Sequence, residues 1–104
     1  MRTVYNKLVR DKIPEIIESE GKIATVRKAE DKEYKLILQE KLVEEVNEFL
    51  ENGNYKELAD VIEVIIALCD INGISFDELL SVVEGKSKAR GGFRDRIILI
   101  SVDE

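Results

Sequence analysis

The chain has 104 residues, a length typical of one ordinary domain. Hydrophobic residues make up 44% of it and charged residues 37%, which provides enough apolar surface for one core inside a highly charged exterior. The formal net charge of −6 at pH 7 argues against long nucleic acid as a partner, because a phosphate backbone would be repelled. We therefore expect a single domain over residues 1–104. At this size, self-association into a homodimer or homotetramer would add stability.

The single cysteine and the polar N-terminal segment bear on where the protein works. Cys69 has no second cysteine to pair with, and it lies in an apolar run, where a cysteine acts as a small hydrophobic residue. The segment from Arg2 to Lys12 is polar and charged, unlike a signal peptide. No apolar stretch approaches the roughly 18 residues that span a bilayer. We expect a cytoplasmic protein that does not associate with membranes.

The first half of the chain predicts a short helix, a strand and a long helix. Residues 11–19 should form the short helix, with Asp11 as its cap and Pro14 in its first turn. Residues 23–28 favour a strand because of their β-branched content. Residues 30–51 contain no glycine or proline and repeat apolar residues at helical spacing, which predicts a long helix.

The second half predicts two more helices and a second strand. Gly53 marks a turn, after which residues 55–71 are apolar around most of a helical circumference, as in a helix buried on several sides. Ser75 and Glu78 have the capping-box spacing that opens a further helix reaching about residue 88. Residues 96–102 favour a strand that pairs with residues 23–28. The predicted fold class is mainly α, an antiparallel helical bundle with a small two-stranded β element.

Four carboxylates on the two long helices are the main functional signal: Glu45, Glu48, Glu57 and Asp60. At about 100° per residue, Glu45 borders the apolar stripe of its helix and Glu57 lies between apolar residues of the next, whereas Glu44 faces away. The connecting turn is short, so positions equidistant from its centre should be level, which pairs Glu48 with Glu57 and Glu45 with Asp60. Helical glutamates are more often a solvated face, and Asn54 with Glu57 also has capping-box spacing, so both alternatives stay open.

Four clustered carboxylates would repel one another in a partly buried place unless a cation intervened. Oxygen ligands without a nearby histidine or cysteine point to Mg²⁺, with Mn²⁺ as an alternative, rather than to zinc. We therefore predict a metal site formed by all four carboxylates. Glu45 and Glu48 are the candidates for activating a water molecule.

Two basic clusters are candidate phosphate-binding groups. The first comprises Lys86, Lys88 and Arg90, just before Gly91-Gly92, and the second comprises Asn6, Lys7, Arg10 and Lys12. The candidates for substrate binding among them are Lys86, Arg90, Asn6, Lys7 and Arg10. Cations at a helix C-terminus are ordinarily explained by the helix dipole, and a charged N-terminal segment by solubility. Either cluster could grip phosphate oxygens if it folded over the carboxylates, but the sequence alone does not place it there.

Three segments together resemble the MazG-like nucleotide pyrophosphohydrolases, an all-α group that includes phosphoribosyl-ATP pyrophosphohydrolases. One segment is the acidic pattern E-E-x-x-E followed by E-x-x-D, formed in this chain by Glu44, Glu45, Glu48, Glu57 and Asp60. The others are the opening Tyr5-Asn6-Lys7-Leu8-Val9-Arg10-Asp11-Lys12-Ile13-Pro14 and the late Lys86-x-x-x-Arg90-Gly91-Gly92-Phe93. The resemblance covers nearly the whole chain and is closest to the small phosphoribosyl-ATP-pyrophosphohydrolase-like members.

The resemblance implies an all-α NTP pyrophosphatase fold and Mg²⁺-dependent cleavage of a nucleoside triphosphate between the α and β phosphates. The products would be a nucleoside monophosphate and pyrophosphate, and one such role is the house-cleaning of non-canonical nucleotides. Only eight residues separate Glu48 from Glu57, fewer than is usual in the family, so loop contacts that choose the base in larger relatives are expected to be absent. The alternatives are a non-catalytic helical oligomerisation module and a regulatory nucleotide-binding protein.

Overall fold

The computed structural model describes residues 1–104 and contains four helices and no strand. The helices are α1 (Ile13–Ser19), α2 (Asp31–Asn52), α3 (Glu57–Ile71) and α4 (Phe76–Arg90). The prediction of a mainly α chain is confirmed, and the predicted helix ends lie within two residues of these bounds.

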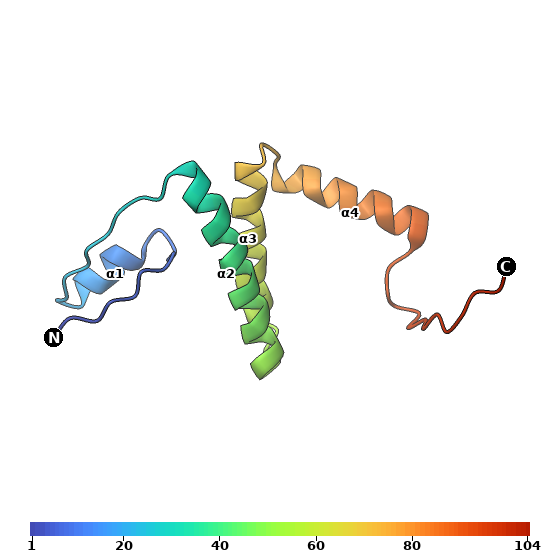
Figure 1. Ribbon diagram of the computed structural model, residues 1–104, viewed down its shortest axis with the longest axis horizontal. Coiled ribbons are helices and arrows are strands. Elements are labelled where there is room, and N and C mark those ends of the chain that lie inside the picture. The colour runs from blue at the N-terminus through green and yellow to red at the C-terminus, as the bar shows by residue number, and fades with distance from the viewer.

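The centre of the molecule is an antiparallel hairpin of α2 and α3 (Figure 1). Gly53 ends α2 in the left-handed conformation, with φ of 66°, and its N–H donates to the carbonyl of Phe49. A side chain is strained at this φ, whereas glycine is not, which is why the chain can reverse at this position. The apolar core comprises Leu38 from α2 and Val64 and Cys69 from α3.

The helix starts differ in how closely they follow the predicted caps. Ser75 and Glu78 form the predicted capping box at the start of α4, where the Ser75 hydroxyl accepts from the Glu78 N–H. Pro14 lies in the first turn of α1, as predicted. Asp11 does not cap that helix, because its N-cap residue is Lys12 and no side chain caps it.

The predicted two-stranded β element is wrong. Residues 23–28 and 96–102 contain no strand, and they lie on opposite sides of the central hairpin (Figure 1). Ile23 is 92% exposed and Ile100 is 91% exposed. β-branched residues give strand propensity, but a strand also needs a neighbour that accepts its backbone hydrogen bonds and covers one face. Neither segment has one.

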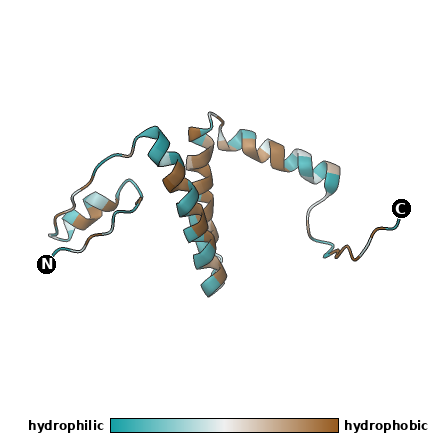
Figure 2. Ribbon diagram, viewed as in Figure 1, coloured by the Kyte–Doolittle hydropathy of each residue, from teal (hydrophilic) through white to brown (hydrophobic).

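The chain is extended rather than compact. Its radius of gyration is 18.7 Å, whereas a compact domain of this length has a value of about 13 Å. α4 meets only α3 and projects away from the hairpin (Figure 1). Figure 2 shows that α3 is apolar along most of its length, yet Leu58 and Ile62 remain 43% and 45% exposed. The expectation that this helix is covered on several sides is therefore not met within one chain.

None of the four helices combines the length and the apolar character that crossing a bilayer requires.

Candidate metal centre

Two groups of three carboxylates meet on the α2–α3 hairpin, and they share Glu45. Oxygen atoms of Glu45, Glu57 and Asp60 lie within 4.8 Å of one another, and so do those of Glu44, Glu45 and Glu48. Glu45 is only 8% exposed and is the one charged residue of the buried set. Because it belongs to both groups, Glu45 is the centre of this cluster. A nearly buried carboxylate is costly unless it is paired or bound to a cation.

The hairpin register brings the two helices' carboxylates together. Glu45 and Asp60 are level across the short turn, as predicted, and their oxygens fall in the same group. The capping-box alternative for Glu57 is not realised. Its carboxylate accepts from the side-chain amide of Asn52 at 3.2 Å, while the backbone N–H of Asn54 donates to Asn52 instead.

The arrangement differs in detail from the predicted rectangle. Glu48 shares a group with Glu44 and Glu45, whereas Glu57 shares one with Glu45 and Asp60. The charge of Glu57 still acts on Glu48, as the predicted pairing of these two residues requires. Glu44, which helical geometry predicted to face away from the site, belongs to the cluster. Residues three and four apart lie on neighbouring surfaces of a helix, and a long glutamate side chain can bridge the remaining rotation.

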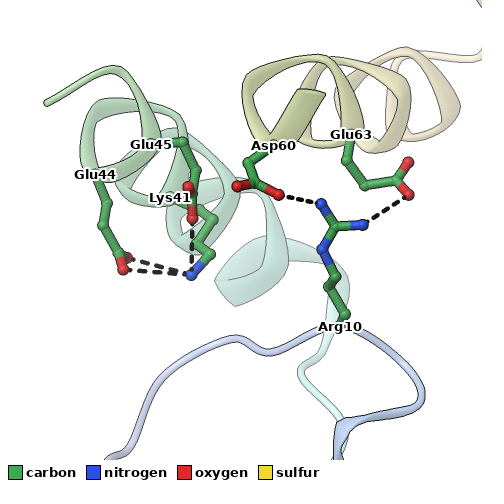
Figure 3. Close-up of polar contacts among 6 residues, drawn as sticks. All are labelled: Arg10, Lys41, Glu44, Glu45, Asp60 and Glu63. Atoms are coloured by element: carbon green, nitrogen blue, oxygen red, sulfur yellow. Dashed lines mark hydrogen bonds and ion pairs between the residues drawn. The ribbon is translucent and has the colours of Figure 1, made fainter. Parts of the chain in front are cut away.

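Basic side chains offset the charge of the cluster (Figure 3). Lys41 Nζ lies 3.4 Å from Glu44 and 3.3 Å from Glu45. Arg10 donates to Asp60 and also to Glu63, at 3.3 Å from the latter. Lys7 of the N-terminal segment adds a third cation beside Glu44. Three basic side chains thus lie against carboxylates of the cluster.

The N-terminal arm, which comprises residues 5–12, reaches both helices of the hairpin. Arg10 ties it to α3 through Asp60 and Glu63, and Lys7 ties it to α2, with its Nζ 3.6 Å from Glu44. Two residues of this basic cluster, Lys7 and Arg10, therefore lie against carboxylates of the hairpin, a position that the sequence alone did not give them. Asn6, another residue of this arm, adopts a left-handed backbone conformation, with φ of 46°.

The second predicted basic cluster is not brought to the carboxylates within one chain. Lys86 and Arg90 belong to the C-terminal part of α4, which points away from the hairpin (Figure 1). Sequence reasoning also missed Lys41 and Glu63. Lys41 precedes Glu45 by four residues, and this i, i+4 spacing was a usable signal. Glu63 belongs to the site only through its contact with Arg10, which is 53 residues away in the chain, so no local pattern could have revealed it.

The pKa of the Glu48 carboxyl lies above its ordinary value. The negative charge of Glu45 raises the pKa of Glu48, and partial loss of hydration and the charges of Glu57 and Glu44 act in the same direction. Lys41 opposes them. Glu48 is exposed, so it is a carboxylate that solvent can reach and that binds protons more readily than an isolated one.

The perturbed Glu48 predicts a pH-dependent stability. Its pKa is higher in the folded chain than in the unfolded chain, so the folded state binds more protons between the two values, and stability falls as pH rises through that window. Without divalent ions, Glu48→Gln should therefore melt above the wild type at pH 8. The difference should close below the ordinary carboxyl pKa near 4.5. Melting curves across this pH range check it, and identical curves at every pH would contradict it.

The donor set suits a hard divalent cation. It consists of carboxylate oxygens from two helices, with no histidine in the chain and with Cys69 buried in the core. Magnesium and manganese prefer such oxygen ligands, whereas zinc prefers nitrogen and sulfur. Glu45, Glu57 and Asp60 are the residues that best fit an ion, because they come from both helices and include the buried carboxylate.

Comparison of this chain with family models, with curated proteins and with solved structures found no match. The function of the site therefore rests on its own geometry and on the motifs in the sequence.

Proposed function

We propose that this protein is a Mg²⁺-dependent nucleoside triphosphate pyrophosphohydrolase of the MazG-like type. The observation that carries the proposal is the nearly buried Glu45 carboxylate, shared by two carboxylate groups and flanked by arginine and lysine side chains. Carboxylates that hold a cation beside basic groups that bind phosphate are the two parts that metal-assisted phosphoanhydride hydrolysis needs. The motif resemblance adds the bond that is cleaved, between the α and β phosphates, with a monophosphate and pyrophosphate as products.

Each side chain has a role in this proposal. Glu45, Glu57 and Asp60 would hold the ion, with Glu48 completing the predicted ligand set. When bound, the ion supplies charge neutralisation at the phosphate oxygens. Arg10, whose guanidinium already bridges two carboxylates, suits bidentate contact with a phosphate.

Water activation falls to one of two carboxylates of the cluster, Glu48 or Glu45. The raised pKa of Glu48 makes it a stronger base than an ordinary glutamate, and Glu45 is the second candidate. The chain lacks histidine, and its single cysteine is buried, so direct attack by water is favoured over a covalent intermediate.

The proposal includes a second copy of the chain. The extended shape, with only four buried residues, leaves apolar side chains exposed on α3, on α4 and in the C-terminal segment. A stable interface is built from such surfaces, and a second hairpin would complete a helical bundle of the all-α pyrophosphatase type. We expect a homodimer or homotetramer by sedimentation at micromolar concentration, and a monomer there would contradict this part.

Arg10 should compete with the metal ion for Asp60. An exposed ion pair contributes about 0.2–1 kcal/mol, so Arg10→Gln should raise the affinity for Mg²⁺ by roughly 2- to 5-fold, because the ion no longer displaces the guanidinium. Titration calorimetry with Mg²⁺ measures this. Lys12→Gln is the matched control, since it removes the same charge from the same arm at a position with no ion pair. Equal changes in Mg²⁺ affinity for the two variants would show that long-range electrostatics, and not the Arg10–Asp60 ion pair, causes the effect.

The function is tested with a panel of standard and modified nucleoside triphosphates, assayed for pyrophosphate release with Mg²⁺ and with EDTA. We expect metal-dependent release that Glu48→Gln greatly reduces while the helical circular dichroism is retained. Nucleotide binding without release would instead favour a regulatory nucleotide-binding protein. Melting that ignores both Mg²⁺ and nucleotides would favour a non-catalytic oligomerisation module.

A further inference from the structure

A groove of about 500 Å³ runs along the hairpin from the carboxylate cluster. Its walls are α2, α3 and the N-terminal arm, and Glu45 and Asp60 line one of its ends. Asp70 follows Asp60 by ten residues along α3, which corresponds to about 15 Å at the rise of an α-helix. The groove is therefore long enough for an extended nucleotide whose phosphates lie at the cluster.

The groove changes in chemistry along its length. Four positions of α2 at helical spacing face it, in the order Glu45, Lys41, Leu38 and Tyr34. Across from them α3 contributes, in the same direction, Asp60, Val64, Ala67 and Asp70. Because the helices are antiparallel, these positions are level in pairs. Acidic ligands thus give way to a lysine, then to an apolar stretch, and finally to an aromatic ring opposite a carboxylate.

The far end of the groove pairs an aromatic ring with an unpaired carboxylate. Tyr34 lines the groove and is half-buried, and a tyrosine ring can stack against a base. Asp70 is exposed and forms no ion pair, in contrast to Glu45 and Asp60 at the other end of the groove. An aromatic face and a hydrogen-bonding edge are the two elements with which proteins recognise a base.

We propose that this end of the groove binds a guanine base, stacked on Tyr34 and hydrogen-bonded by Asp70. The inference deepens the proposed function, on which it rests, by naming the substrate class. A carboxylate offers two acceptors and no donor. Guanine presents two adjacent donors, its N1–H and its 2-amino group, whereas adenine and cytosine place an acceptor beside their amino group. The single N–H of uracil lies between two carbonyls, so guanine alone matches Asp70 with both donors.

The test uses monophosphates, so binding is read without turnover. Ligand-observed NMR in the presence of Mg²⁺ measures the binding of GMP, AMP, CMP, UMP and xanthosine monophosphate to the wild type. GMP should bind at least about tenfold more tightly than the others, because a site built for paired hydrogen bonds rejects bases that leave it unpaired. Asp70→Asn replaces one acceptor by a donor. Xanthine carries a carbonyl where guanine carries its amino group, so the variant should prefer xanthosine monophosphate over GMP.

Two further variants separate base recognition from structure. Tyr34→Leu should weaken all five nucleotides alike, because stacking does not depend on the hydrogen-bonding edge. Asp77→Asn, an exposed aspartate of α4 outside the groove, should leave the order of affinities unchanged.

The outcomes are distinguishable from those of the proposed function. Equal binding of all monophosphates by the wild type, or an unchanged ratio of GMP to xanthosine monophosphate in Asp70→Asn, would overturn the guanine site even if triphosphates are cleaved. Selective GMP binding with the predicted switch, in a protein that cleaves no triphosphate, would support the guanine site and overturn the hydrolase.

Discussion

Replacing Glu45 by glutamine is expected to abolish the Mg²⁺-dependent rise in melting temperature and to lower pyrophosphate release by about 10²-fold or more. The carboxylate belongs to both carboxylate groups, so its loss removes the ligand that they share. An ion present at about 100 times its dissociation constant stabilises a protein by about 2.7 kcal/mol. For a domain of this length, that corresponds to roughly 10 °C or more in the melting temperature.

The matched control for this variant is Glu40→Gln. Glu40 is an exposed glutamate of the same helix and belongs to neither carboxylate group, so its replacement should leave both the Mg²⁺ response and the activity near those of the wild type. Scanning calorimetry with and without Mg²⁺ gives the first readout and pyrophosphate release the second. A Glu45→Gln protein that still gains the full metal-dependent stability would show that the ion, if it binds, sits elsewhere.

Leu38→Ala is expected to destabilise the folded chain by about 2–5 kcal/mol, the usual cost of removing a buried leucine side chain. Leu38 is 2% exposed and is the most deeply buried side chain, in a chain with only three buried hydrophobic residues. Few other contacts can therefore compensate for the cavity. Urea or thermal unfolding followed by circular dichroism measures the loss, which should lower the melting temperature by roughly 10 °C or more.

Leu36→Ala provides the comparison on the same helix. Leu36 is 57% exposed, and surface substitutions generally change stability by no more than about 0.5 kcal/mol. Similar losses for both variants would indicate that a partner subunit covers Leu36, because burial in an oligomer would give it the same packing role. A negligible loss for Leu38→Ala would contradict the position of the core.

The local parts of the fold could be predicted from the sequence because their causes are local. Gly53 lies where a left-handed residue is needed, and the short turn then fixes the helix register, so the meeting of Glu45 with Asp60 followed from counting residues. Ser75 and Glu78 cap α4 as their spacing indicated. In each case the decisive interaction joins residues that are near one another in the chain or related by simple helical geometry.

The parts that could not be predicted depend on contacts between distant segments. Arg10 and Asp60 are fifty residues apart, and no periodicity links them. The prediction of a β element was wrong because strand propensity does not supply a partner strand. Ile23 and Ile97 remain exposed. Glu44 entered the cluster through the reach of its side chain, which helical angles alone do not describe.

The most direct test is anomalous diffraction from crystals grown with Mn²⁺, which takes the same oxygen ligands as Mg²⁺. The proposal predicts a strong peak between α2 and α3, at coordination distance from Glu45 and from Glu57 or Asp60, with the Arg10 guanidinium moved off Asp60. A map with no peak on the hairpin, and with Arg10 still bound to Asp60 at millimolar Mn²⁺, would contradict the metal centre and the proposed function that rests on it.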